Sequence, residues 1–596
     1  MNEPSDSDRE EDFSVRDSRP RAKLDSPVVN ADVPEHQISD LEKQQKFELV
    51  WRDISEAVET QLRDEMPVLI HDANLDVEGK LPSDRSHILI EGDNLHALHV
   101  LQATHQRAID VIYIDPPYNR GKDLIYNDTF VDKDDPCRHS KWLSFMSKRL
   151  VLAEQLLNED GVMFISIDDN SQAQLRLLCD QVFGPRSFVA NFVWIKKRKA
   201  SNLDKSVRSI TEYVLCYSKN GRSLIHPEDV VEEDKPYPFY NTGNKRKVLS
   251  FPKGVKFTSI DNQKLGPQTF RAKKTSVRLL DSVKIVKGVA QNAFRLEGEW
   301  RYSQVAVDGM FRAGEEVVFK GTDFKPYLIN KSEDRFKLMR SLLSAETYGI
   351  GTNEDGTEEL FQLIGKNDFD YPKPVSLVHA LLAAALRPDH NSLVLDFFAG
   401  SGTTLEAVAR LNSETGASHQ CILATNNENG ICRDIAIPRV TAVLTGMNGR
   451  RKIREALPGS LSFFKTGFVK RSKSPDRMRA EIAKYTVDLI AVKEGTGKTV
   501  LRSANMSILH GVNKTVVVAP GLESDHSRLC TAAENKVRPG NRKVVYVFTW
   551  SDYGVEEEVA ALWPGWDVNP LPAEMLAALR RLVPPARLFD APEAAS

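Results

Sequence analysis

The sequence predicts an α/β fold in which one mainly parallel sheet is split by a long insertion and followed by a small additional α/β domain. Short apolar runs at 87–90, 111–115 and 162–167 alternate with segments of helical periodicity. Such alternation is typical of parallel strands joined by crossover helices. The alternation stops over 196–365 and resumes at about 366. Two α/β blocks therefore flank an insertion of different character.

Strand and helix patterns alternate along both halves of the core. The run at 87–90 is followed by a helical segment (LHALHVLQATH), and the next strand ends at two prolines. Residues 141–158 place seven apolar residues on one helical stripe, which are Trp142, Phe145, Met146, Leu150, Ala153, Leu156 and Leu157. After the insertion the same pattern gives a strand at 391–396, a helix at 403–411 and a strand at 421–425.

Changes in pattern divide the chain into six segments. The polar N-terminal tail is poor in aromatic residues and is expected to be disordered. The C-terminal segment is expected to hold strands at 515–519 and 544–549 and a closing helix at 571–583. The segments are a tail at 1–36, a helical segment at 37–85, the first half of the core at 86–195, the insertion at 196–365, the second half of the core at 366–450 and a C-terminal domain at 451–596.

Composition restricts the class of protein. A hydrophobic content of 41% and a charged content of 27% are those of a soluble globular chain. No apolar run is long enough for a membrane span, and the N-terminus has no signal-peptide pattern, so a cytoplasmic protein is expected. The six cysteines form no C-x-x-C pair, which argues against a zinc site, and no metal site is expected. The net charge of −3 means that any nucleic-acid surface must be a local patch.

The first motif with chemical content is Asp115-Pro116-Pro117-Tyr118. The prolines cannot donate to a strand ladder, so the preceding strand ends at Asp115 and a stiff loop follows. In open α/β sheets the carboxyl ends of strands are where ligands bind. The loop offers a carboxylate, an aromatic ring and the Pro116 carbonyl, which no ladder uses. This set of groups suits a planar ring that carries an amine.

The second motif is the glycine loop, residues 396–404, between a strand and a helix. Its two glycines allow a tight turn and let a ligand approach the backbone N–H groups at the start of the helix. The third glycine of the dinucleotide fingerprint is replaced by Leu405, which weakens a nicotinamide or flavin interpretation. The acidic residue beside the glycines suits a cationic ligand better than a pyrophosphate. The candidate ligand contacts are Asp396, Phe398, Ala399, Gly400, Gly402 and Thr403.

Further candidates follow the ends of other strands. Glu428 comes after the strand at 421–425, where a carboxylate for ribose hydroxyls is expected, with Asn426 and Asn427 as nearer competitors. Asp93 follows the first strand and is a candidate either for a ligand contact or for a helix N-cap. Asp168 and Asp169 end the strand at 162–167 and are also pocket candidates.

The insertion is the candidate nucleic-acid surface. Between 245 and 287 it has twelve Lys and Arg against two Asp and Glu. Basic clusters of this kind mark phosphate contacts, although a solvated basic face is the alternative for any single cluster. The candidate contacts are Lys196, Lys197, Arg198, Lys199, Lys245, Arg246, Lys247, Lys273 and Lys274. Gly495 to Thr499 resembles the end of a P-loop, but Val492 stands where its earlier glycine is required.

The two motifs, in this order and with the basic segment between them, resemble the β-class of S-adenosylmethionine-dependent DNA amino-methyltransferases. The closer resemblance is to modification subunits of type III restriction–modification systems. It covers about 86–450 and rests also on 91–95, 164–170, Pro372-Lys373-Pro374 and 425–429. It implies a circularly permuted Rossmann-like three-layer methyltransferase sheet whose insertion recognises the target. Lys373 matches the Lys-Pro element that caps the methionine end of S-adenosyl-L-methionine, and a surface lysine is the alternative.

The resemblance implies transfer of a methyl group to N6 of an adenine flipped out of double-stranded DNA. Asp115 and the Pro116 carbonyl would accept hydrogen bonds from the amine, and Tyr118 would stack on the base. It leaves open a homodimer and a restriction subunit with helicase and nuclease activity. The alternatives are an N4-cytosine enzyme, a protein or RNA amino-methyltransferase, and an inactive DNA-binding scaffold. Asp rather than Ser before Pro-Pro-Tyr favours adenine.

Overall fold

The computed structural model describes residues 51–572 with internal gaps. The expected disordered tail and most of the expected closing helix at 571–583 therefore lie outside the described residues. The gaps are at 52, 54–55, 82–84, 121–136, 200–206, 222–235, 273–274, 322, 330–337, 367–368, 388–389, 471–474, 497, 504–505, 512, 520–523 and 548–556.

The core is a ten-stranded sheet in the order β1-β23-β2-β20-β19-β3-β4-β6-β5-β18. The strands from β23 to β4 run parallel, whereas β1 and β6 are antiparallel to their neighbours. The inner strands are almost wholly apolar because both faces of the sheet are covered. The bounds are β1 (Glu65–His71), β2 (His87–Glu91), β3 (Ile109–Ile114), β4 (Leu157–Ile167), β5 (Phe188–Ile195), β6 (Thr211–Ser218), β18 (Leu342–Leu343), β19 (Leu393–Asp396), β20 (Gln420–Thr425) and β23 (Leu461–Lys470).

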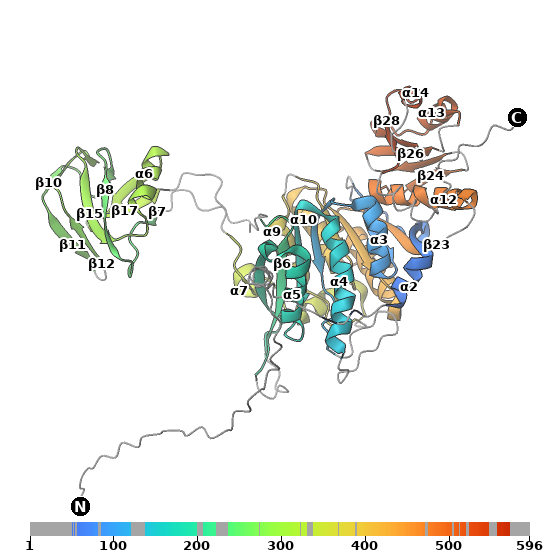
Figure 1. The fold of residues 1–596 in the computed structure, drawn as a ribbon, viewed down its shortest axis with the longest axis horizontal. Helices are drawn as coiled ribbons and strands as arrows, with labels where there is room; N and C mark the ends of the chain where they lie inside the picture. The colour runs from blue at the N-terminus through green and yellow to red at the C-terminus, as the bar shows by residue number, and fades with distance from the viewer. Residues whose placement is uncertain are drawn as a thin grey trace, which may run out of the picture. The chain divides into compact units, whose positions relative to one another are not determined.

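Helices cover both faces of this sheet, which confirms the predicted three layers. One apolar cluster joins the sheet to α2, α3, α4 and α5, and a second cluster on the other face joins it to α8, α9, α10 and α11. Figure 1 shows α3, α4 and α5 side by side across one face. The bounds are α2 (Ala57–Asp64), α3 (Asn94–His105), α4 (Arg138–Leu156), α5 (Gln172–Phe183), α7 (Ala345–Tyr348), α8 (Asn353–Ile364), α9 (Val375–Ala385), α10 (Thr403–Thr415) and α11 (Ile437–Thr445).

Short elements complete the core. The turn after β20 continues through a 3-10 segment and a π-helical segment into α11. A two-stranded hairpin, β21 with β22, follows α11. The bounds are η1 (Ala73–Leu75), η2 (Pro185–Ser187), η3 (Glu428–Gly430), η4 (Ile431–Ala436), β21 (Met447–Asn448) and β22 (Arg451–Lys452).

The insertion forms two mainly antiparallel sheets around its own aromatic-rich core, with one parallel pair, β9 with β16. A seven-stranded sheet has the order β10-β13-β14-β9-β16-β17-β7, and a four-stranded sheet has the order β11-β12-β15-β8. Their inner faces meet in one cluster that includes Phe251, Phe257, Phe294, Phe319 and Phe324. The bounds are β7 (Pro236–Pro238), β8 (Arg246–Phe251), β9 (Lys256–Phe257), β10 (Gln263–Leu265), β11 (Gln268–Ala272), β12 (Thr275–Leu279), β13 (Val283–Val286), β14 (Val289–Ala290), β15 (Phe294–Glu299), α6 (Gln304–Arg312), β16 (Glu316–Lys320) and β17 (Lys325–Ile329).

The C-terminal domain is a five-stranded sheet in the order β24-β25-β26-β27-β28. The expected strands at 515–519 and 544–549 correspond to β26 and β27, which pair in parallel. Among the described residues, no helix is long and apolar enough to cross a membrane. The bounds are α12 (Pro475–Glu494), β24 (Lys498–Arg502), β25 (Ser507–His510), β26 (Lys514–Ala519), α13 (His526–Glu534), β27 (Arg542–Val547), α14 (Glu557–Ala561) and β28 (Asp567–Pro570).

The structure differs from the expected segments in three places. The strand β6 belongs to the core sheet rather than to the insertion, because it returns antiparallel to β4. The strand β23 belongs to the core rather than to the C-terminal domain, because it pairs with both β1 and β2. Within the expected helical segment at 37–85, the helix α2 is followed by the edge strand β1, which was not expected. The strands β1 and β23 pair with each other although they are distant in sequence.

Candidate active site

The two motifs meet at the carboxyl edge of the central sheet. The strands β3 and β19 are parallel neighbours, with Val111 opposite Val394 and Ile112 opposite Leu395. Asp115 follows β3, and Asp396 ends β19, so both motifs leave the sheet at the same edge. The proline loop and the glycine loop, nearly half the chain apart in sequence, are therefore adjacent in the fold.

Both oxygens of the Asp115 carboxylate have partners. Lys373 Nζ lies 2.7 Å from Oδ2, and the Tyr118 hydroxyl donates to Oδ1 at 2.7 Å. The Lys373 side chain is only 7% exposed, whereas the Asp115 side chain is 28% exposed. The carboxylate therefore lies at an accessible edge while the cation that balances it is buried.

The ring of Tyr118 lies between two cations. Lys373 Nζ is 5.0 Å from the ring centroid, and the Arg120 guanidinium carbon is 5.1 Å from it. Burial, together with the nearby Asp115 and Glu212 carboxylates, raises the pKa of Tyr118 well above its ordinary value. The hydroxyl is therefore a proton donor throughout the physiological range, held in one orientation by Asp115.

The prolines give the loop one unused acceptor. The Pro117 carbonyl accepts a hydrogen bond from Trp142 Nε1 at 2.7 Å, which fixes the loop to α4. The Pro116 carbonyl accepts none from the residues that the structure describes. Asn119, next along, has a φ of 60°, a left-handed conformation that turns the chain away from the sheet. The expected pair of acceptors, Asp115 and the Pro116 carbonyl, is thus present on one loop.

Glu212 is a site residue that the sequence analysis missed. Its carboxylate receives Lys196 Nζ at 3.0 Å and Arg120 at 3.1 Å on Oε1, and the Tyr118 hydroxyl at 3.3 Å on Oε2. It starts the apolar strand β6, whose antiparallel return brings its first residues to the carboxyl end of β4. The available signal was one acidic residue at the head of an apolar run. In the structure this residue is 2% exposed. A buried carboxylate of this kind needs nearby cations, and here it has Lys196 at 3.0 Å, Arg120 at 3.1 Å and Lys373 at 3.9 Å.

Asp168 also lies in this cluster. Its Oδ2 accepts a hydrogen bond from Arg120 Nε at 2.7 Å, so Arg120 bridges the end of β4 and the start of β6. Asp169 instead accepts a hydrogen bond from the exposed Tyr213 hydroxyl at 2.8 Å. Of the two acidic residues singled out at this strand end, Asp168 is therefore the one that contacts the proline-loop cluster.

Asp396 holds the glycine loop together. Its Oδ1 accepts from the Phe398 N–H at 3.0 Å, and its Oδ2 accepts from the Thr404 hydroxyl at 2.5 Å. Burial raises the pKa of Asp396 to about 7. Gly400 and Gly402 have φ values of 49° and 82°, left-handed conformations that explain why glycine stands at these positions.

A buried ion pair supports the glycine loop from behind. Arg439, on α11, donates to the Thr403 hydroxyl at 2.7 Å and to the Ser401 hydroxyl at 3.0 Å, and it lies 3.1 Å from Glu406. Burial opposes ionisation of Glu406, but Arg439, Arg410 and Arg454 together lower its pKa to about 2. The loop therefore rests on a rigid charged cluster rather than on apolar contacts alone.

The remaining ligand candidates lie near the same edge. Asp93 is the N-cap of α3, where its Oδ1 accepts the Leu95 N–H at 2.8 Å. Lys373 contacts both motifs, because its carbonyl accepts from the Thr403 hydroxyl at 3.4 Å while its ammonium binds Asp115. Glu428 follows β20, half-buried, and accepts from Asn426 Nδ2 at 3.3 Å. Phe398 and Ala399 are buried within the loop.

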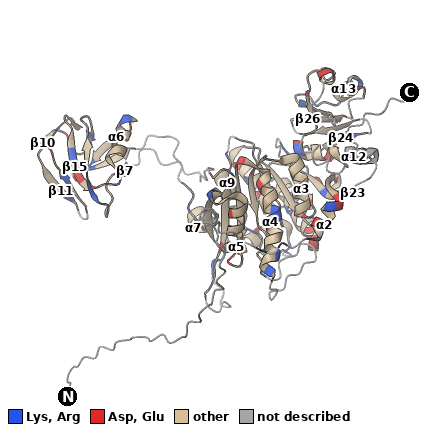
Figure 2. Ribbon diagram, in the orientation of Figure 1, with Lys and Arg blue, Asp and Glu red and all other residues tan. Residues whose placement is uncertain are grey.

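The basic candidates separate into two groups. Lys196 points into the active site toward Glu212, and Arg198 pairs with Asp355 at 2.6 Å, whereas Lys199 is exposed. Lys197 is half-buried. The exposed residues Lys245, Arg246 and Lys247 lie at the start of β8 in the insertion, and Lys273 and Lys274 lie outside the described residues. Figure 2 shows Lys and Arg along several strands of the insertion.

Comparison with known proteins places the site in context. A family model described as DNA methylase matches residues 109–436, more than half of the chain. The Mod subunit of the type III restriction–modification enzyme StyLTI from Salmonella typhimurium is 31% identical over 366 residues, 57% of this chain and 52% of that protein. The EcoPI Mod subunit of Escherichia phage P1 is 32% identical over 414 residues, 60% of this chain and 62% of that protein.

A shorter relative matches over most of its length. The type II methyltransferase M.KpnI of Klebsiella pneumoniae is 30% identical over 395 residues, which are 65% of this chain and 89% of that protein. By contrast, the chain spans only about half to three-fifths of the length of the two Mod subunits that it matches. The family model spans both the proline loop and the glycine loop on which the site is built.

Proposed function

The chain belongs to the DNA methylase family, and we propose that it transfers a methyl group from S-adenosyl-L-methionine to N6 of an adenine flipped out of double-stranded DNA. The observation that carries this proposal is the position of Asp115, the free Pro116 carbonyl and Tyr118 beside the glycine loop. A donor site and an acceptor site for the same methyl group must be adjacent, and here they leave neighbouring strands.

The chemistry explains the acceptor side. The lone pair of an aromatic exocyclic amine is conjugated into the ring, so the nitrogen is a poor nucleophile. Hydrogen bonds from its two N–H groups to the Asp115 carboxylate and the Pro116 carbonyl draw the nitrogen toward tetrahedral geometry and free the lone pair. The rest of the rate enhancement comes from holding the reactants in line. Tyr118 provides an aromatic face for the extruded base, whose removal from the duplex costs a few kcal/mol.

The residues around the glycine loop fit S-adenosyl-L-methionine. Among the described residues, the Gly400 and Ser401 N–H groups donate to no partner, and they lie at the N-terminal end of α10. Such donors suit the carboxylate of the methionine end, and Lys373 supplies a cation beside them. Asp93 and Glu428 would bind the adenosine and the ribose hydroxyls. When bound, the cofactor supplies a methyl group activated by a sulfonium.

The fit of Lys373 implies an order of events. In the structure its ammonium occupies Asp115 Oδ2, one of the acceptors that the target amine requires. An anionic carboxylate bound near Gly400 would draw the ammonium away from Asp115. We infer that cofactor binding precedes productive entry of the base.

We propose that the insertion recognises the DNA sequence and that double-stranded DNA is the macromolecular substrate. Exposed basic residues on its strands supply the local positive charge that a chain of net charge −3 otherwise lacks. The proposal extends to a role in restriction–modification or phage defence in the cytoplasm, with a homodimer and a separate restriction subunit as candidate partners. The similarity to Mod subunits supports this extension.

Long-read sequencing of host DNA, with and without the gene, tests the proposal. We expect N6-methyladenine within one short recognition sequence, and we expect that mark to disappear with Asp115→Ala although the variant still binds DNA. Detection of N4-methylcytosine in the recognition sequence would instead identify cytosine as the substrate. Unmodified DNA from a cell that holds folded wild-type protein would favour an inactive scaffold and contradict the proposal.

A further inference from the structure

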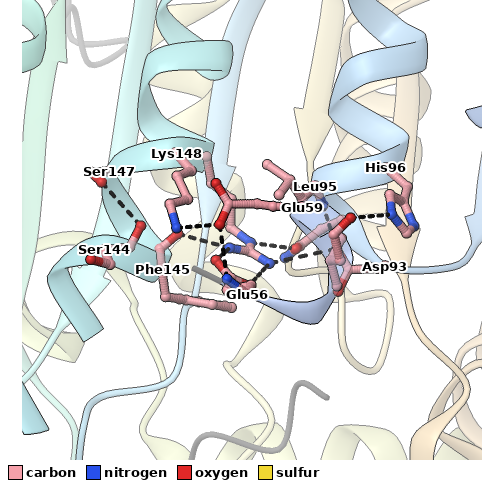
Figure 3. Close-up of polar contacts among 12 residues, drawn as sticks. Glu56, Glu59, Asp93, Leu95, His96, Ser144, Phe145, Ser147 and Lys148 are labelled. Carbon is pink, nitrogen blue, oxygen red and sulfur yellow. Dashed lines mark hydrogen bonds and ion pairs between the residues drawn. The ribbon is translucent and has the colours of Figure 1, made fainter. Parts of the chain in front are cut away.

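A fully buried arginine connects the N-terminal segment to the ligand site. Arg149, on α4, has 0% side-chain exposure, and its guanidinium lies 3.6 Å from the Phe145 ring centroid. All its N–H groups face acceptors. Nε donates to Asn94 Oδ1 at 2.6 Å, one terminal nitrogen to the Phe145 carbonyl at 2.8 Å, and both terminal nitrogens to Glu56 at 2.9 and 3.0 Å. Figure 3 shows Glu56, Phe145 and Asp93 around this point.

The cluster continues into the glycine loop. Asn94 receives Arg149 on its carbonyl oxygen and donates through Nδ2 to the Phe397 carbonyl at 3.0 Å. The Phe145 ring, which the guanidinium covers, lies 5.9 Å from the ring of Phe398. A movement of Arg149 would therefore displace Phe397 and Phe398, the first two residues after Asp396. The N-terminal segment that carries Glu56 is thus mechanically linked to the cofactor loop.

Two carboxylates lie near the same buried guanidinium. Glu56 accepts two hydrogen bonds from it, whereas Asp93 Oδ1 lies 3.5 Å from the nearer terminal nitrogen. A buried guanidinium needs a compensating carboxylate. Without Glu56, Asp93 would have to form that ion pair with Arg149. Asp93 already caps α3, and under the proposed function it also binds the adenosine.

We propose that Glu56 is a positioning residue of the cofactor site. By neutralising Arg149, Glu56 prevents the guanidinium from forming a closer ion pair with Asp93. It also holds Arg149 where Asn94 stays hydrogen-bonded to the Phe397 carbonyl. The N-terminal segment before the first core strand is then a functional part of the site rather than an appendage. This inference rests on the proposed function, because it assigns Asp93 to the bound cofactor.

Calorimetric binding of S-adenosylhomocysteine to the full chain, without DNA, tests the inference. We expect Glu56→Gln to weaken binding by about tenfold or more, the scale of one hydrogen bond to a charged group. Methyl transfer at saturating cofactor should keep a kcat within about twofold of the wild type. The weaker binding should instead appear as a higher KM for the cofactor. Glu59→Gln is the matched control, because Glu59 on α2 pairs with Lys148 on α4 at 2.7 Å, and a glutamine there can still accept the Glu56 N–H that Glu59 Oε2 accepts at 2.8 Å.

A double variant separates positioning from a merely structural role. Glu56→Gln combined with Arg149→Met removes both charges, so that Asp93 has no buried guanidinium to neutralise. We expect the double variant to bind S-adenosylhomocysteine more tightly than Glu56→Gln alone. It also serves as the second test if the single variant does not fold, since no buried guanidinium is left without Glu56. In that case recovered folding with binding within threefold of the wild type supports the inference.

The outcomes are distinguishable. Equal loss of binding in Glu56→Gln and Glu59→Gln, no loss in Glu56→Gln, or no recovery in the double variant would overturn the inference while leaving the proposed function intact. Wild-type protein that binds no S-adenosylhomocysteine would overturn the proposed cofactor site and this inference together.

Discussion

Lys373 and Asp115, 258 positions apart in the chain, form a 2.7 Å ion pair at the meeting point of the two halves of the core. The pair satisfies the acceptor that a target amine requires and uses the cation that a ligand carboxylate would require. Under the proposed function this one contact engages a group that each substrate requires, and one movement of Lys373 would open both sites. This coupling follows from placing the Lys-Pro segment between the proline loop and the glycine loop.

We expect Lys373→Met to uncouple base extrusion from cofactor binding. In the wild type, fluorescence of 2-aminopurine at the target position should rise only when S-adenosylhomocysteine is present, because Lys373 must first leave Asp115. In Lys373→Met the rise should occur without it, while the affinity for S-adenosylhomocysteine falls about tenfold or more. Identical cofactor dependence in both proteins would show that the ion pair does not control entry of the base.

We expect Tyr118→Phe and Tyr118→Ala to fail at different steps. The Phe variant loses the hydrogen bond to Asp115 but keeps the ring, so it should retain the 2-aminopurine signal while kcat falls about tenfold or more. The Ala variant also loses base stacking, worth about 1–3 kcal/mol, and should lose the signal itself. Rapid-quench methyl transfer and fluorescence on the same DNA measure both steps. Equal signals from the two variants would remove Tyr118 from the role of stacking platform.

The elements with local signals were predictable from the sequence. The strands β2, β3, β19 and β20 show continuous apolar runs, and the glycine and proline loops end two of them because of backbone chemistry that acts within a few residues. The three-layer architecture followed from their alternation with helices. Nothing in this reasoning required knowledge of the tertiary contacts.

The contacts of the site were harder to predict from the sequence, because they depend on which distant strands become neighbours. Glu212 enters the site only because β6 runs antiparallel to β4, and the sequence of β6 carries no sign of its direction. Lys196 reads as one member of a basic surface cluster, yet its ammonium binds Glu212. The edge strand β1 and its neighbour β23 were missed because they find their partners across most of the chain.

Glu212→Gln should destabilise the fold as well as the site. Its carboxylate, 3% exposed, balances Lys196 and Arg120, and removing its charge takes this partner from Lys196 while Arg120 keeps Asp168. Because Arg120 is 40% exposed and partly solvated, we expect a loss of about 2–3 kcal/mol in the free energy of unfolding. Urea denaturation measures the loss, and Glu354→Gln on the exposed first turn of α8 should change it by less than about 0.5 kcal/mol. A variant as stable as the control would show that water replaces the carboxylate.

Two lysines of the insertion stand directly opposite each other. Lys264 on β10 faces Lys284 on β13, both exposed, an arrangement that destabilises a sheet unless an anion lies over it. Replacing both by Ala should reduce the salt dependence of DNA binding by about 1.8 in the log–log slope, about 0.9 for each lost phosphate contact. The 85% exposed Lys470 provides the control substitution. An unchanged slope in a titration between 50 and 200 mM salt, roughly the range over which such contacts are lost, would place the DNA on another face.

Asp396 makes the stability of the protein depend on pH in a defined direction. Burial raises its pKa from an ordinary value of 3.8 to about 7, so between these values the folded chain retains a proton that the unfolded chain has released. The contribution of Asp396 to the free energy of unfolding should therefore fall as pH rises through this window, by about 1.4 kcal/mol per pH unit. Asp396→Asn cannot release a proton, so the difference between variant and wild type should shift in the variant's favour by about 2–3 kcal/mol between roughly pH 5 and pH 8. Urea denaturation of both proteins at the two pH values measures this difference, in which the other titrating groups cancel. A constant difference would mean that the Asp396 carboxylate is ionised throughout, with the Thr404 hydroxyl and the Phe398 N–H sufficient to hold its charge.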